Sequence, residues 1–292
     1  MTIRCIWDGK AELGEGALWH DEEQALYWVD IFKSVLHRYS RHGETETWPF
    51  PDSISSIVPA QSGGFLATFD YGVAHIDLQE NKVTRLLRLE EDLPDNRMND
   101  GCCDTQGNLW FGSMDTKQLN LSGSFYRLGA AASAEKIESV GPFCITNGPT
   151  FSEDGRWVFL TDTVERRIYR AGLDTDANPA HIEIFIETDP ALGHPDGMCT
   201  DRDGGLWVCF FGGAKVIRFD RDGNADASVD VPAPNVTKCA FGGHDMKTLF
   251  ITTATAGMSA EQLEEFPLAG GLFAAEVDYE GFCFPPAVCP IS

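Results

Sequence analysis

The sequence has few basic residues and no cluster of them. Its 292 residues include 22 Lys and Arg against 45 Asp and Glu, which gives a formal net charge of −23 at pH 7. Proteins that bind nucleic acids or anionic membranes need grouped positive charge opposite the phosphates. We therefore predict neither a nucleic acid nor a membrane as a partner.

Long apolar runs and leader-like features are also missing. No stretch approaches the roughly 18 apolar residues of a membrane-spanning helix, and the first seven residues lack a charged start followed by an apolar stretch and a cleavage site. The nine cysteines are an odd number without paired spacing, and several lie within predicted strands as small apolar residues. We expect a soluble, cytoplasmic protein with reduced thiols.

Several catalytic motifs are missing as well. There is no Gly-x-Ser-x-Gly elbow, phosphate-binding loop or dinucleotide fingerprint, and the seven histidines and the cysteines lack the spacing of the usual zinc sites. His194 is the one histidine close in sequence to the candidate site described below, and we interpret it as a loop residue.

What the sequence does have is a repeat of six units. Each unit has a strand with a polar start, a turn rich in Gly and Asp, an aromatic-rich second strand and a third strand. The second strands begin at Leu26, Phe65, Leu109, Trp157, Leu206 and Leu249. Their spacing of 39 to 49 residues is typical of propeller blades. We predict an all-β, six-bladed β-propeller with few helices, forming a single domain over residues 1–292.

Two further features complete the predicted architecture. The segment Ile3 to Asp8 precedes the first unit, so we expect it to pair as the outer strand of the last blade and close the ring. The long excursions 115–123 and 256–270 interrupt the regular spacing, and we predict that they are loops at the channel mouths.

The polar starts of the six units occupy equivalent positions, 10 to 12 residues before the second strands. These positions are Glu15, Ser55, Asn99, Asn147, Asp196 and Thr237. Because inner propeller strands begin at the same end of the central channel, we expect these side chains to meet on one axis. Two carboxylates and two amides brought together favour a bound cation.

The predicted metal ligands are Glu15, Asn147 and Asp196, with water or substrate completing the shell. Such an all-oxygen shell admits Ca²⁺, Mg²⁺, Mn²⁺, Zn²⁺ or Fe²⁺. Asn99 belongs to the same ring, and Arg97 lies two residues earlier on the approach to it. Both are candidates for binding a polyhydroxylated ligand above the metal, although Arg97 could instead balance a carboxylate at the rim. For Asp100 we predict a buried capping role.

Several motifs resemble those of the SMP-30/gluconolactonase/LRE family of six-bladed propellers, in particular its bacterial sugar lactonases. The motifs are Leu13-Gly-Glu-Gly-Ala-Leu-Trp, Asn96-Arg-Met-Asn-Asp-Gly, Leu109-Trp-Phe-Gly-Ser-Met, Ile145-Thr-Asn-Gly-Pro, Pro195-Asp-Gly, Ala233-Pro-Asn-Val-Thr-Lys and Pro267-Leu-Ala-Gly-Gly. The resemblance implies that Glu15, Asn147 and Asp196 bind a divalent metal and that Arg97 and Asn99 contact the substrate.

The resemblance also implies an activity. Similar bacterial proteins hydrolyse sugar aldonolactones, which points to an arabinono-, xylono- or gluconolactone as the small-molecule substrate. Some relatives, including the animal regucalcins, carry an acidic substrate contact shortly after the Gly-Ser/Thr-Met motif, whereas Asp115-Thr-Lys117 follows it here. The sequence therefore does not specify the sugar.

The predicted mechanism uses the cation as a Lewis acid on the lactone carbonyl. Asp196, which we predict to be catalytic, could act as the general base, or hydroxide bound to the metal could attack instead. Two alternatives stay open: a non-catalytic calcium-binding or interaction propeller, and a metal-dependent esterase or phosphotriesterase. We expect a monomer.

Overall fold

The computed structural model describes residues 2–131 and 133–288. Within these ranges the chain forms 24 strands, one α-helix and one short 3-10 helix. It divides into two compact units: unit 1 comprises Met1–Ser53 and Thr188–Cys283, and unit 2 comprises Ile54–Glu187 and Phe284–Ser292.

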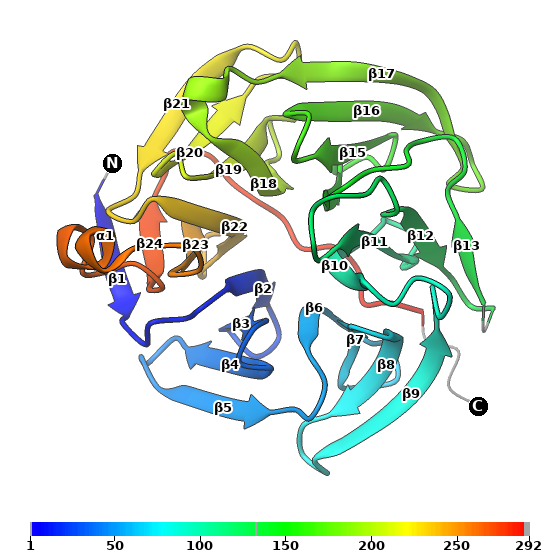
Figure 1. Ribbon diagram of the computed structural model, residues 1–292, viewed down its shortest axis with the longest axis horizontal. Helices are drawn as coiled ribbons and strands as arrows, with labels where there is room; N and C mark the ends of the chain where they lie inside the picture. Colours follow the sequence, from blue (N-terminus) through cyan, green and yellow to red (C-terminus); the bar gives the residue numbers. More distant parts are fainter. Residues whose placement is uncertain (1, 132, 289–292) are drawn as a thin grey trace. The chain divides into compact units, whose positions relative to one another are not determined.

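Unit 2 contains three antiparallel sheets, and in each of them four consecutive strands pair in chain order (Figure 1). The first is β6 (Ile54–Pro59), β7 (Phe65–Phe69), β8 (Gly72–Asp77) and β9 (Lys82–Arg88). The second is β10 (Asn96–Cys103), β11 (Leu109–Asp115), β12 (Phe125–Leu128) and β13 (Ala134–Lys136). The third is β14 (Thr146–Phe151), β15 (Trp157–Asp162), β16 (Arg167–Leu173) and β17 (Pro179–Glu187).

Unit 1 contains one four-stranded sheet of the same kind and one eight-stranded sheet. The small sheet is β2 (Gly14–His20), β3 (Ala25–Asp30), β4 (Val35–Ser40) and β5 (Thr45–Pro49). The large sheet has one half made of β18 (His194–Thr200), β19 (Leu206–Phe211), β20 (Lys215–Phe219) and β21 (Ala225–Asp230). Its other half is β22 (Asn235–Gly242), β23 (Thr248–Ala254), β24 (Leu272–Glu276) and β1 (Ile3–Trp7). The two halves are joined in one sheet where Phe211 pairs with Asn235.

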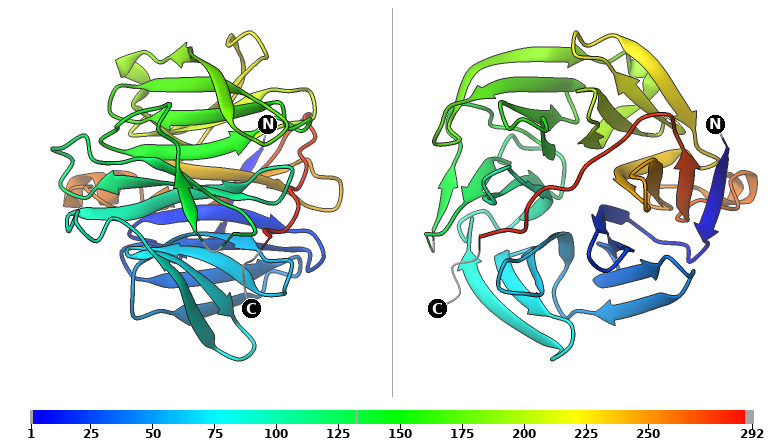
Figure 2. Two further views of the ribbon diagram at one scale, coloured as in Figure 1. Left: turned by 90° about the vertical axis from the view of Figure 1, so that its right-hand side faces the viewer. Right: turned by 180° about the vertical axis from the view of Figure 1, so that it is seen from behind.

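The predicted pairing of the N-terminal segment is confirmed. β1 runs antiparallel to β24, with Ile3 opposite Ala275 and Cys5 opposite Phe273; Figure 1 shows dark blue β1 beside orange-red β24, and the right-hand view of Figure 2 shows the same pair from behind. The all-β class, with small antiparallel sheets typical of a propeller, is confirmed too. The closed six-bladed ring and the single domain stay predictions.

One predicted loop contains a helix. The excursion 256–270 includes α1 (Ala260–Glu265), whose N-terminus carries a capping box between Ser259 and Gln262. In this motif each side chain accepts a hydrogen bond from the backbone N–H of the other residue. The remaining helical turn, η1 (Pro190–Leu192), precedes β18. Among the described residues, no helix is long and apolar enough to cross a membrane.

A repeated sequence pattern, Asp-x-x-Gly-x-Leu-Trp, fixes the turn between the first and second strands of two sheets. The Asp104 carboxylate accepts a hydrogen bond from the Trp110 indole at 3.0 Å, and the Asp201 carboxylate accepts one from the Trp207 indole at 2.8 Å. Both tryptophans are fully buried. Each turn also contains a glycine with positive φ, where a side chain would strain the backbone. The pattern therefore anchors a large core side chain and satisfies its polar N–H in the same place.

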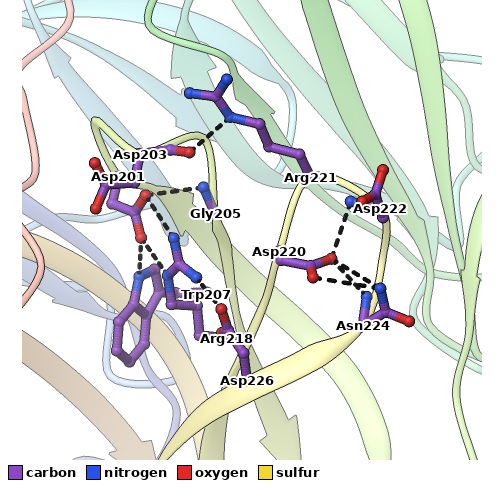
Figure 3. Close-up of polar contacts among 10 residues, drawn as sticks. All are labelled: Asp201, Asp203, Gly205, Trp207, Arg218, Asp220, Arg221, Asp222, Asn224 and Asp226. Atoms are coloured by element: carbon purple, nitrogen blue, oxygen red, sulfur yellow. Dashed lines mark hydrogen bonds and ion pairs between the residues drawn. The ribbon is translucent and has the colours of Figure 1, made fainter.

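The Asp201 turn also holds a buried ion pair (Figure 3). Arg218, on β20, donates from Nε to Asp201 at 2.6 Å and from Nη1 to Asp226. The side chains of Arg218 and Asp201 are 5% and 0% exposed. The guanidinium also lies 4.0 Å from the centre of the Tyr279 ring. Burial of this charge is therefore compensated by two carboxylates and an aromatic face.

Candidate functional site

The predicted site residues share a structural feature that the sequence did not reveal. The pairing register shifts on the inner strand of every repeat, and in each case the irregularity lies at or directly beside the predicted ring residue. The shifts lie between Glu15 and Leu18, Ile54 and Ser56, Met98 and Gly101, Asn147 and Thr150, Pro195 and Met198, and Val236 and Cys239. Bulges of this kind redirect side chains away from regular alternation and often border active sites.

In unit 2 the structure brings the three predicted site residues into one chain of hydrogen bonds. Arg97 donates from Nη1 to Asn99 Oδ1 at 2.7 Å, and Asn99 donates from Nδ2 to Asn147 Oδ1 at 2.9 Å. Asn99 Nδ2 also donates to the Thr146 carbonyl at 2.7 Å. Both asparagines are buried. The predicted substrate contacts are thus in direct contact with the predicted amide ligand.

The orientation of the Asn147 amide follows from its two partners. Its Nδ2 donates to Thr163 Oγ1 at 2.9 Å, so its Oδ1 faces Asn99. An amide oxygen has two lone pairs, and Asn99 uses one of them. The second remains chemically suited to a hard cation.

Asp100 has the capping role that the sequence predicts. It is 3% exposed, and its carboxylate accepts hydrogen bonds from the backbone N–H groups of Gly101 at 2.8 Å and Gly148 at 3.1 Å. It therefore ties the bulge of β10 to the bulge of β14 and supports Asn99 and Asn147.

In unit 1 the two predicted carboxylate ligands are both buried. Glu15 is 6% exposed and Asp196 is 7% exposed. Glu15 Oε2 accepts a hydrogen bond from the Gly16 N–H at 3.0 Å, and Gly16 has a φ of 60°, which favours glycine. Thr237 donates from its hydroxyl to the Gly14 carbonyl at 2.5 Å. This bond fixes the start of β2, the strand that carries Glu15, against β22.

One buried lysine, which packs against Gly197 directly after Asp196, was not predicted from the sequence. Lys238 follows Thr237 and is only 6% exposed. Its stem packs against Gly197, where a Cβ would overlap Lys238 Cδ. The one local signal is the Asp196-Gly197 pair, because glycine admits close approach of a neighbouring strand.

Burial, helped by Cys239 and the nearby Asp196 carboxylate among other groups, raises the pKa of the Cys209 thiol well above its ordinary value.

The loop after β11 is held by Asp115, the last residue of that strand. The Asp115 carboxylate accepts hydrogen bonds from the backbone N–H groups of Lys117, Leu119 and Asn120, and these bonds, that of Lys117 foremost, lower the pKa of Asp115. Lys117 Nζ forms a surface ion pair with Asp95 at 2.7 Å.

His194 is the first residue of β18, opposite Phe211, so its interpretation as a loop residue was wrong.

The donor set fits a hard cation. Within residues 2–131 and 133–288, no group of three or more His, Cys, Asp or Glu side chains is arranged to hold a metal ion. The predicted set contains only two residues of those types, Glu15 and Asp196, and its third oxygen is the Asn147 amide. The eight cysteines in the described part of the chain are free thiols.

The sequence of this chain matches a family model, the SMP-30/Gluconolactonase/LRE-like region, over residues 13–255. The chain belongs to this family. The match spans all the predicted site residues, from Glu15 to Asp196, in both units.

Known proteins similar to the chain include two bacterial lactonases. It is 32% identical over 286 residues to 6-deoxy-6-sulfogluconolactonase of Pseudomonas putida, covering 97% of this chain and 98% of that protein. It is 35% identical over 278 residues to L-arabinolactonase of Azospirillum brasilense, covering 94% and 91%. Among solved structures, a calcium-binding regucalcin from Agrobacterium tumefaciens superposes with a TM-score of 0.92 at 29% identity, covering 98% of this chain and 97% of that one.

Proposed function

We propose that this protein hydrolyses the ring ester of a sugar aldonolactone, of the arabinono-, xylono- or gluconolactone type, with the help of one divalent cation. The observation that carries the proposal is the hydrogen-bond chain from Arg97 through Asn99 to Asn147. It joins two groups suited to sugar hydroxyls to an amide oxygen suited to a metal. The names of two relatives, a sulfogluconolactonase and an arabinolactonase, support the same reaction class.

The proposed metal ligands are Glu15, Asn147 and Asp196. Their burial and their all-oxygen chemistry support this assignment. We propose that the sheets form one six-bladed propeller, as the repeat spacing predicts, whose channel receives all three side chains. When bound, the cation supplies Lewis-acid polarisation of the lactone carbonyl.

The residues of the chain have separate tasks in the proposed reaction. Arg97 and Asn99 bind the ring hydroxyls and orient the lactone. Asp196 accepts the proton from the attacking water as that water adds to the carbonyl carbon. The ring C–O bond then breaks as Asp196 returns this proton to the ring oxygen. The new carboxylic acid ionises, which releases one proton and leaves one open-chain aldonate with a free hydroxyl group.

The test is proton release from a panel of aldonolactones, measured with metal-stripped protein reconstituted with Ca²⁺, Mg²⁺, Mn²⁺, Zn²⁺ or Fe²⁺. Spontaneous hydrolysis is subtracted with matched metal solutions lacking protein. We expect metal-dependent acceleration on one or a few lactones. No acceleration on any lactone with any metal would contradict the proposal and favour a non-catalytic calcium-binding propeller; turnover of aryl esters or phosphotriesters alone would indicate the esterase alternative.

A further inference from the structure

Glu90 joins three strands of unit 2 through a single carboxylate. It follows β9, and its φ of 55° is uncommon for a residue with a side chain. Its Oε1 accepts hydrogen bonds from Ser113 Oγ at 2.6 Å and from the Tyr126 hydroxyl at 2.7 Å. Its Oε2 accepts one from Asn96 Nδ2 at 2.7 Å. The partners lie on β11, β12 and β10.

The first arm of this network, through Oε1, fixes Glu90 itself. Burial raises the pKa of the Tyr126 hydroxyl, and its hydrogen bond to Glu90 raises it further, so this hydroxyl stays a donor at neutral pH. The Ser113 carbonyl in turn accepts a hydrogen bond from Thr146 Oγ1 at 2.8 Å, directly before Asn147. This arm therefore leads toward the proposed metal ligand.

The second arm, through Oε2, ends at the residue before Arg97. The Asn96 amide is fully engaged: Nδ2 also donates to the Ser122 carbonyl at 3.1 Å, and Oδ1 accepts from Ser122 Oγ at 2.6 Å. Since Oδ1 is occupied by a donor, Asn96 must present its NH₂ group to Glu90. Glu90 and Ser122 together hold the start of β10, from which Arg97 extends to Asn99.

We propose that Glu90 is a positioning residue that sets the direction of Arg97 for substrate binding. The inference rests on the proposed lactonase function. A carboxylate suits this place because it accepts all three hydrogen bonds and donates none. Glu90 contacts no reacting atom; it acts through Asn96 on the strand that carries the substrate contact.

The two arms can be separated by one substitution. In Glu90→Gln the amide oxygen keeps the hydrogen bonds from Ser113 and Tyr126. The new NH₂ group, however, faces the NH₂ group of Asn96. We expect KM for the lactone to rise about tenfold or more while kcat changes less than about threefold, because uniform binding is lost rather than transition-state stabilisation. Since the arm toward Asn147 is retained, metal affinity measured by calorimetry should stay within about twofold.

Three further variants complete the experiment. Glu91→Gln removes the same charge from a neighbouring exposed side chain, 70% exposed, and should leave KM unchanged. Glu90→Gln combined with Asn96→Asp restores a donor facing an acceptor at this contact but loses the hydrogen bond to the Ser122 carbonyl, so its KM should fall part of the way back toward the wild-type value. Asn96→Ala breaks the same arm from the other side; it should raise KM as Glu90→Gln does, and it tests the inference if Glu90→Gln does not fold.

The outcomes separate this inference from the proposed function. Wild-type protein without lactonase activity on any metal would overturn the function. An active wild type with an unchanged KM in Glu90→Gln and Asn96→Ala would overturn the role of Glu90 alone. A fall in kcat at constant KM in Glu90→Gln would also overturn it.

Discussion

The side-chain amide of Asn99 donates a hydrogen bond to the side-chain oxygen of Asn147 across 2.9 Å, and the two residues lie in the bulges of different sheets of unit 2. Because Thr163 binds the other end of the Asn147 amide, the direction of its oxygen is determined by hydrogen bonding rather than by rotamer preference alone. The contact makes the proposed substrate-binding residue and the proposed metal ligand interdependent.

The first prediction reverses the polarity of this contact. In Asn99→Asp a carboxylate replaces the donor and faces two acceptors, the Asn147 oxygen and the Thr146 carbonyl. We expect the free energy of unfolding to fall by about 1–3 kcal/mol and kcat/KM to fall by about 100-fold or more. Urea unfolding and lactone hydrolysis measure the two effects. Ser55→Ala serves as the comparison, because Ser55 occupies the equivalent bulge and its hydroxyl forms a hydrogen bond with Thr68; equal activity losses in both variants would contradict the prediction.

The second prediction concerns Asp196. Asp196→Asn keeps the size of the side chain and one oxygen donor but removes the charge and the basicity. We expect kcat to fall by about 10²–10⁴-fold and metal affinity to fall as well, since the proposed carboxylate ligand is lost. Steady-state kinetics at saturating metal, with affinity from calorimetry, distinguish the two roles. Retained turnover with intact metal binding would remove Asp196 from the mechanism.

The sequence predicts the strand register of the site well because that register is local. A spacing of 10 to 12 residues between ring position and second strand follows from strand length and hairpin turns, and the structure places all six positions at equivalent irregularities. The pairing of β1 was predictable because the first segment has no repeat of its own. The bulges were not predicted, although glycines directly after Glu15, Asn147 and Asp196 were their available signal.

Non-local packing accounts for what the sequence did not predict. The burial of Lys238 depends on the missing side chain of Gly197, about 40 residues away on another strand. The network of Glu90 depends on Ser113 and Tyr126 from two later strands. The α1 helix is different: its Ser259 and Gln262 capping box is visible in the sequence, but the prediction of a loop used only the interrupted spacing.

A third prediction tests the buried ion pair of Figure 3. Arg218→Met leaves Asp201 buried without its guanidinium partner, although Trp207 and Gly205 still donate to it. We expect a loss of about 3–5 kcal/mol in the free energy of unfolding. Arg221→Met is the matched control, because Arg221 binds the Asp203 carbonyl at the surface and should change stability by less than about 1 kcal/mol. Chemical denaturation measures the free energy of unfolding of both variants. Similar losses of stability in the two would contradict the prediction.

The last prediction concerns stability at acidic pH. His37 packs against the rings of both Trp7 and Trp28, each with its centre 4.9 Å away, and its Nδ1 is 3.1 Å from Thr47 Oγ1. Burial lowers the pKa of His37 from 6.5 to about 4. The unfolded chain therefore binds more protons at this residue between these two values, so stability falls as the pH falls from 6.5 to about 4.

The magnitude follows from the shift. The lowered pKa of His37 corresponds to a contribution of about 3 kcal/mol to the free energy of unfolding. This contribution is fully present above pH 6.5 and is lost near pH 4. In His37→Gln this part of the pH dependence should disappear, so the difference in unfolding free energy between wild type and variant should shrink by about that amount on acidification. His42→Gln, a substitution at an exposed histidine nearby, should leave the wild-type slope unchanged. Urea unfolding at half-unit pH intervals provides the comparison, and parallel curves for wild type and His37→Gln would show that His37 is not the group that titrates.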